Sequence, residues 1–185
     1  MDDRSTPEQA YRTFRGALAR GEHEREWACL SDDLRRERLG MRSRSDWKDA
    51  RAVALHRNHP VVWGIVHSDV REPRALPDGR VLLDLRFPLG YRGQVWMRRV
   101  PVLMAFGADS LDPVVYEHLP ALEVSKTGGG LRVAVPSEML GWIDPKDLEG
   151  VVRVEAALLW FLDDFAVGDE DSRTVRGTIE GAGEP

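Results

Sequence analysis

The sequence contains little cysteine and no long apolar segment, and both absences limit its function. Of its 185 residues one is a cysteine, Cys29, which excludes an intramolecular disulfide and a cysteine-based zinc cluster. No apolar run approaches the roughly 20 residues of a membrane-spanning helix, so we predict no membrane partner. The polar first nine residues lack the basic start and hydrophobic stretch of a secretory signal, which predicts a cytoplasmic protein.

A basic excess is also missing. The formal net charge of −5 predicts no nucleic-acid partner, because proteins that bind nucleic acid usually carry a basic domain. Six tryptophans and 42% hydrophobic residues indicate one folded domain, and a chain of this length buries enough surface to fold without disulfides or a metal. The sequence carries no strong metal or nucleotide signature, so we expect neither a metal nor a cofactor. Residues 35–51 are locally basic, and internal ion pairs on a solvated helix are favoured there over an anion site.

Helical patterns fill the first third of the chain. Thr6 and Pro7 are typical of a helix start, and apolar residues then recur at helical spacing as far as Gly21, a typical helix end. Cap residues and apolar positions predict further helices over residues 22–30, 31–40 and 45–56.

Strand patterns follow in the middle of the chain. Alternation between Val81 and Phe87 predicts one buried strand face, with Asp84 and Arg86 pointing outward. Pro101 lacks a ladder donor, so its strand either lies at an edge or bends, which predicts a curved sheet. The predicted strands are residues 61–70, 81–87, 95–106 and 114–118, with a glycine-turn hairpin over 122–126 and 131–135.

The last third combines an apolar segment with an acidic end. Asp144 to Phe165 has a broad apolar arc at helical spacing, which predicts a C-terminal helix. Trp160 and Arg153 fall on its more polar side, so we predict an interaction surface there. Residues 167–185 are acidic, rich in glycine and without periodicity, which predicts a disordered tail.

Two stretches of the sequence match motifs of a known fold. The first runs from Thr6 and reads TPEQAYRTFRGALARGE; the second runs from Leu122 to Pro136 and reads LEVSKTGGGLRVAVP. They resemble the first helix and the closing hairpin of the nuclear transport factor 2-like superfamily, which includes ketosteroid isomerases, scytalone dehydratases and polyketide cyclases. Leu131 stands where that hairpin usually has a tryptophan.

The resemblance implies an α+β fold in which N-terminal helices pack on a strongly curved, mostly antiparallel sheet that forms a cone around a pocket. We expect one domain over residues 1–166, with its core at about 6–136. The predicted helix at 144–165 is an addition to the family pattern, which either caps the pocket or replaces the family's sheet-to-sheet dimer contact. No catalytic residue of the family's enzymes transfers to this sequence.

Three residues are candidates for acid–base chemistry. On the predicted strand over 61–70, His67 and Asp69 share a face, where they suit a general base and the group that orients it. A solvent-exposed strand end is the favoured interpretation. Tyr116 lies in a second group of acidic and basic residues, for which a strand edge is favoured. His56 and His59 suit a helix end better than a metal site, so we predict no metal ligands.

Tyr11, Phe14, Trp63 and Trp96 either line a hydrophobic pocket or form plain core. The sequence favours a non-catalytic domain that binds a small apolar ligand or a protein partner and self-associates, as a homodimer, through its C-terminal helix. One alternative is an isomerase, dehydratase or cyclase that uses His67, Asp69 or Tyr116. A second alternative is a structural assembly subunit.

Overall fold

The computed structural model describes residues 3–53, 60–107, 113–116, 123–127, 130–134, 149–168 and 175–176. The chain forms two compact units. Unit 1 comprises Val100–Leu159, and unit 2 comprises Asp2–Arg99 together with Trp160–Pro185. Two compact units do not decide whether the chain folds as one domain, so the single domain over residues 1–166 stays a prediction.

Helix α1 (Pro7–Arg20) begins and ends as the sequence predicts. The Thr6 side chain accepts a hydrogen bond from the Gln9 amide, which satisfies one of the free donors of the first turn. Gly21 ends the helix with φ 70°, a left-handed conformation that suits glycine. These local signals alone define α1.

Further helical segments precede the sheet strands in the described part of unit 2. They are α2 (His23–Ala28), the π-helix η1 (Leu34–Arg38), α3 (Arg44–Val53) and α4 (Pro60–Val66). The predicted strand over 61–70 is wrong, because residues 60–66 form α4 and only β1 (Asp69–Val70) is extended. A short apolar run does not distinguish a helix from a strand by periodicity, and Pro60 is well suited to the first helical position.

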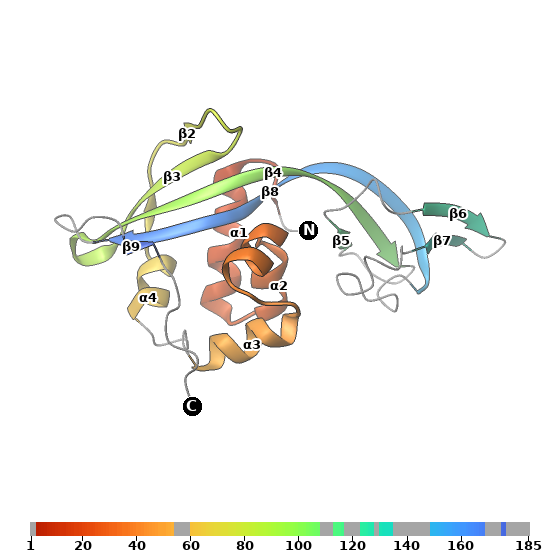
Figure 1. Ribbon diagram of the computed structural model, residues 1–185, viewed down its shortest axis with the longest axis horizontal. Coiled ribbons are helices and arrows are strands. Elements are labelled where there is room, and N and C mark those ends of the chain that lie inside the picture. The colour runs from red at the N-terminus through yellow and green to blue at the C-terminus, as the bar shows by residue number, and fades with distance from the viewer. Residues whose placement is uncertain are drawn as a thin grey trace. The chain divides into compact units, whose positions relative to one another are not determined.

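The sheet of unit 2 lies to one side of the helices (Figure 1). Its strand order is β1–β3–β4–β8–β9, and β2 also pairs with β3. The pairs β1–β3, β2–β3, β3–β4 and β8–β9 are antiparallel, so the predicted α+β class is confirmed. These strands are β2 (Arg74–Ala75), β3 (Val81–Arg86), β4 (Arg92–Gly107), β8 (Val151–Gly168) and β9 (Val175–Arg176), with the 3-10 turn η2 (Pro88–Gly90) between β3 and β4.

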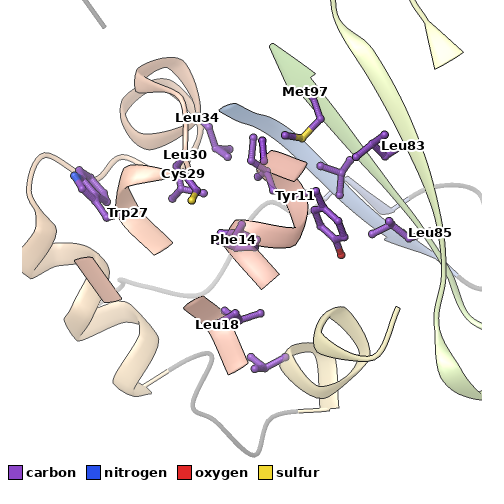
Figure 2. Close-up of a cluster of buried hydrophobic side chains, with 14 of the residues drawn as sticks. Tyr11, Phe14, Leu18, Trp27, Cys29, Leu30, Leu34, Leu83, Leu85 and Met97 are labelled. Atoms are coloured by element: carbon purple, nitrogen blue, oxygen red, sulfur yellow. The ribbon is translucent and has the colours of Figure 1, made fainter. Parts of the chain in front are cut away.

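The core of unit 2 lies between α1 and the sheet. Figure 2 shows Tyr11 of α1 beside Leu83 and Leu85 of β3 and Met97 of β4, and all four side chains are buried. The predicted alternation on β3 is confirmed in part: Leu83 and Leu85 face the helices and Arg86 is exposed, whereas Asp84 is half-buried and Leu82 is buried. Complete burial of a large apolar side chain contributes about 1.5–3 kcal/mol, so this contact is a main stabilising interaction of the unit.

Pro101 lies inside β4, between the residues that pair with β3 and those that pair with β5 (Val114–Tyr116), where neither pairing needs a backbone amide. The register with β3 ends at Met97, and the register with β5 begins at Leu103. Pro101 falls between these two paired stretches and is exposed. The missing amide therefore removes no hydrogen bond from either pairing.

The described strands of unit 1 are β5, β6 (Glu123–Thr127), β7 (Gly130–Ala134) and the adjoining parts of β4 and β8. β6 and β7 pair antiparallel, with Thr127 opposite Gly130, so the predicted hairpin is confirmed. The predicted strand over 114–118 is confirmed for residues 114–116.

The predicted helix over Asp144–Phe165 is wrong for residues 151–165, which belong to the 18-residue strand β8. Its apolar arc is so broad that the same residues also alternate with period two, and the sheet supplies the partner strand that this pattern needs. Residues 144–148 lie outside the described residues. Within the predicted tail over 167–185, Val175 and Arg176 form β9 and pair with the end of β8.

None of the helices in the described part of the chain is long and apolar enough to cross a membrane.

Candidate functional site

The residues predicted for acid–base chemistry lie at the surface where they are described. His67 follows α4 and is exposed, with its ring 4.9 Å from the ring of Trp63. Asp69 is also exposed and lies in β1 opposite Arg86. Both therefore face solvent instead of the core between α1 and the sheet. Tyr116 belongs to β5, but its side chain lies outside the described residues, as do His56 and His59.

The four predicted pocket residues do not lie together. Tyr11 and Phe14 are buried in the core of unit 2. Trp63 is 46% exposed. Trp96 is half-buried and lies between Val95 and Met97, which face the helices, so its side chain is on the opposite face of the sheet. The structure thus distributes these aromatic side chains over three environments.

Tyr11 is a buried ionisable side chain of α1 in the core between that helix and the sheet. Its hydroxyl lies 2.9 Å from Ser68 Oγ, and that Oγ donates to the Ile65 carbonyl at 2.8 Å. The single Ser68 hydroxyl proton is therefore used, so Tyr11 donates to Ser68. Burial raises the pKa of Tyr11 to about 12, and Tyr11 stays protonated at neutral pH.

Tyr11→Phe is expected to change how stability falls at high pH. The Tyr11 pKa is about 12 in the folded protein, against about 10 for an ordinary tyrosine. The folded state holds this proton more tightly, so its stabilisation is complete below about pH 10 and is lost as the pH rises through about 12. Urea unfolding across this window should therefore show a steeper loss for the wild type than for Tyr11→Phe. Parallel profiles would contradict the raised pKa, and Tyr91→Phe, which alters an exposed ring, is the control.

A buried ion pair joins α2 to α3. Glu26 is fully buried, and its Oε2 accepts hydrogen bonds from Arg51 Nε at 2.7 Å and from Trp47 Nε1 at 3.0 Å. Arg51 Nη2 donates to Oε1 at 3.2 Å, which completes a two-pronged contact. His23 Nδ1 lies 3.6 Å from Glu26 Oε1. We call Glu26, Trp47 and Arg51 the glutamate cluster.

A second buried carboxylate lies on β8. Asp163 Oδ1 accepts from Ser31 Oγ at 2.9 Å and pairs with Arg98 Nε at 3.1 Å, and Oδ2 pairs with Arg80 Nη1 at 3.4 Å. Asp163 is almost completely buried, whereas both arginines reach solvent. We call Asp163, Ser31, Arg80 and Arg98 the aspartate cluster. It joins the turn before β3, the strands β4 and β8, and the segment after α2.

The basic segment over residues 35–51 forms internal ion pairs. Arg35 pairs with Asp32 at 2.8 Å, and Arg38 pairs with Asp164 of β8 at 2.6 Å. Arg51 belongs to the glutamate cluster. The interpretation as internal ion pairs therefore accounts for these three basic residues.

A strip of apolar side chains is exposed on β8 in unit 1. Val152, Val154, Ala156 and Leu158 share one strand face because side chains alternate. Val152 is 47% and Leu158 50% exposed, Ala156 is exposed and Val154 is half-buried. We call these four residues the apolar stripe. Exposed apolar patches of this kind are typical of interaction sites.

The opposite face of this part of β8 carries charge. The Arg153 guanidinium lies over the Phe106 ring at 4.0 Å and pairs with Glu155 at 3.3 Å. Arg153 and Glu155 are both exposed. Trp160, the other residue of the predicted interaction surface, is half-buried and packs against the core of unit 2. The stripe was missed because residues 144–165 were assigned to a helix, although its period-two pattern is readable in the sequence.

The second edge of β8 is open over residues 151–159, as far as the described residues show. β4 occupies the first edge. On the second edge β9 pairs only with Ala166 and Val167, and the Trp160 and Leu162 amides donate to the carbonyls of Arg4 and Cys29. An open strand edge is a template for pairing with another chain.

Comparisons with known proteins identify no relative, so the candidate site is chosen from the structural features above. A scan with protein-family models, a search of curated proteins and a search of solved structures each return no match to this chain. Within the described ranges, no group of three His, Cys, Asp or Glu side chains is placed to hold a metal ion. The open strand of unit 1, with its apolar stripe, is the candidate functional site.

Proposed function

We propose that this chain is a non-catalytic binding domain that contacts a protein partner through the apolar stripe of β8. The observation that supports the proposal is the exposure of Val152 and Leu158 on one strand face beside an open edge. A partner strand would satisfy the backbone groups of this edge, and its side chains would pack beside the stripe on the same face of the sheet.

The interior of unit 2 supports a ligand pocket less well. Tyr11, Phe14, Leu83 and Met97 pack against one another there, and the Tyr11 hydroxyl already has its partner in Ser68. An acid–base enzyme needs an inward-facing group that titrates near neutral pH. The raised pKa of Tyr11 does not meet that requirement, and His67 and Asp69 are exposed.

We also propose the nuclear transport factor 2-like cone as the finer fold assignment. The capped first helix, the antiparallel β3–β4 pair and the β6–β7 hairpin occur in the order that the resemblance implies. An experimental structure tests this proposal. A sheet that curves around the N-terminal helices is the expected result, and a flat sheet would reject the assignment.

Substitution of a stripe residue by lysine is expected to weaken partner binding. Val152→Lys and Leu158→Lys place a charge on a surface that the partner must desolvate, which should weaken binding by roughly tenfold or more. The measurement is affinity capture from extracts of the source cells, with quantitative mass spectrometry of the proteins retained by the wild type.

Val53→Lys is the matched control, because Val53 is 83% exposed on α3 of unit 2, outside the stripe. It should retain the proteins that the wild type retains. Circular dichroism of each variant checks the fold. Equal capture by the Val152→Lys and Val53→Lys variants would reject the stripe as the interaction surface.

A further inference from the structure

We infer that the partner of the apolar stripe is a second copy of this chain, paired antiparallel with it along the open edge of β8 and centred on Val154. The inference rests on the proposed function, because it uses the same surface. It adds the identity of the partner, the direction of the pairing and its register.

The direction of the backbone groups on β8 determines which residues would pair. Trp160 and Leu162 direct their amides to the second edge, where they donate to Arg4 and Cys29. In a regular strand, alternate residues direct their amides to the same edge. The amides of Leu158, Ala156 and Val154 therefore point to the open edge. In an antiparallel dimer these even-numbered residues would form the hydrogen-bonded pairs.

The charges next to the stripe select one register. With the two-fold axis at Val154, Arg153 lies opposite the partner subunit's Glu155, and Glu155 lies opposite the partner subunit's Arg153. These odd-numbered pairs are the non-hydrogen-bonded ones, in which side chains approach most closely. An axis at Ala156 would instead place Glu155 opposite the partner subunit's Ala157 and lose both charge pairs.

The same register aligns the apolar stripes of the two copies. Val152 lies opposite the partner subunit's Ala156, and Val154 lies opposite the partner subunit's Val154. Both stripes then form one face of a continuous sheet. A two-fold axis uses the same patch on both subunits, and this strand matches itself in charge and in polarity. The self-complementarity favours a second copy over an unrelated protein.

Charge reversal tests the pairing directly. Arg153→Glu and Glu155→Arg each create two like-charge pairs across the axis, so each variant alone should dimerise roughly tenfold more weakly than the wild type in sedimentation velocity. A mixture of the two variants should dimerise again, because every cross-strand pair in the mixed dimer has opposite charges. The double variant Arg153→Glu/Glu155→Arg should also dimerise. Arg132→Glu, an exposed change on β7 of the same unit, should have no effect.

Introduced cysteines test the register. Hydrogen-bonded antiparallel residues have Cα atoms about 5.5 Å apart, which is within the range that a disulfide spans. Val154→Cys should therefore cross-link to itself, whereas Val152→Cys should cross-link only to Ala156→Cys. The native Cys29 is buried, so the introduced thiols are the reactive ones. Cross-linking of Val152→Cys to itself would overturn the register.

The two proposals fail in different ways. A wild type that stays monomeric at every concentration, or a mixture of charge variants that does not recover, overturns the second copy as partner. If stripe variants still lose a captured protein in that case, the proposed function stands with a different partner. If capture is also insensitive to the stripe, both proposals fail.

Discussion

Glu26→Gln should lower the free energy of unfolding by about 3–5 kcal/mol, because removal of one member of a buried ion pair leaves the other charge without compensation. Arg51 is almost completely buried and directs two nitrogens at the Glu26 carboxylate, so its charge would lose its partner inside the protein. The amide keeps the shape of the side chain, so the loss measures charge and not volume. Urea unfolding followed by tryptophan fluorescence measures it, since Trp47 contacts the same carboxylate.

Two further variants test whether the loss of stability comes from the broken Glu26–Arg51 ion pair or from any substitution in this region. Glu22→Gln removes a nearby carboxylate that pairs with Arg20 and Arg25 at the surface, and it should leave the unfolding midpoint almost unchanged. The double variant Glu26→Leu/Arg51→Met replaces the pair with apolar groups and should recover most of the lost stability. A double variant less stable than Glu26→Gln would contradict this account of the glutamate cluster.

Asp163→Asn is expected to have the second-largest effect, a loss of about 3 kcal/mol. The carboxylate accepts from Ser31 and pairs with Arg80 and Arg98 while it is almost completely buried. Both arginines reach water and have second carboxylate partners. Their charges would therefore stay better compensated after the substitution than the charge of Arg51 after Glu26→Gln. Chemical denaturation at constant pH gives the loss.

The neighbouring residue supplies a control for Asp163. Asp164 lies on the same strand and pairs with Arg38 close to the surface, so Asp164→Asn should cost less than about 1 kcal/mol. A double-mutant cycle with Ser31→Ala should show coupling between Ser31 and Asp163 of about 1 kcal/mol. Additive effects of the two changes would contradict the hydrogen bond between them.

Parts of this fold follow from local sequence signals, and those parts were predictable. Thr6, Pro7 and Gly21 mark α1 by their own conformational preferences, and alternation marks β3. Two short-range patterns were ambiguous. The run after Pro60 is apolar at nearly every position, and the segment after Val151 satisfies helical and strand periods together, so tertiary pairing decided both.

The polar clusters were not predictable from the sequence. Glu26 and Arg51 are 25 positions apart, and Ser31 and Asp163 are 132 apart, so no local pattern connects the members. Charged residues are mostly exposed, and this expectation holds until a partner is known. The apolar stripe is different, because its alternation was present in the sequence and was hidden only by the helix assignment.

The interrupted sequence of unit 2 has a consequence for synthesis. Phe161, Leu162 and Asp163 complete this unit, yet they leave the ribosome only after all of Val100–Leu159. Until then the apolar side of the first helices and strands is not covered by the end of β8. At usual rates of translation this interval lasts on the order of several seconds. Contacts so distant along the chain also slow folding. The nascent chain is therefore expected to depend on chaperones during this interval more than a chain with a continuous core of the same size.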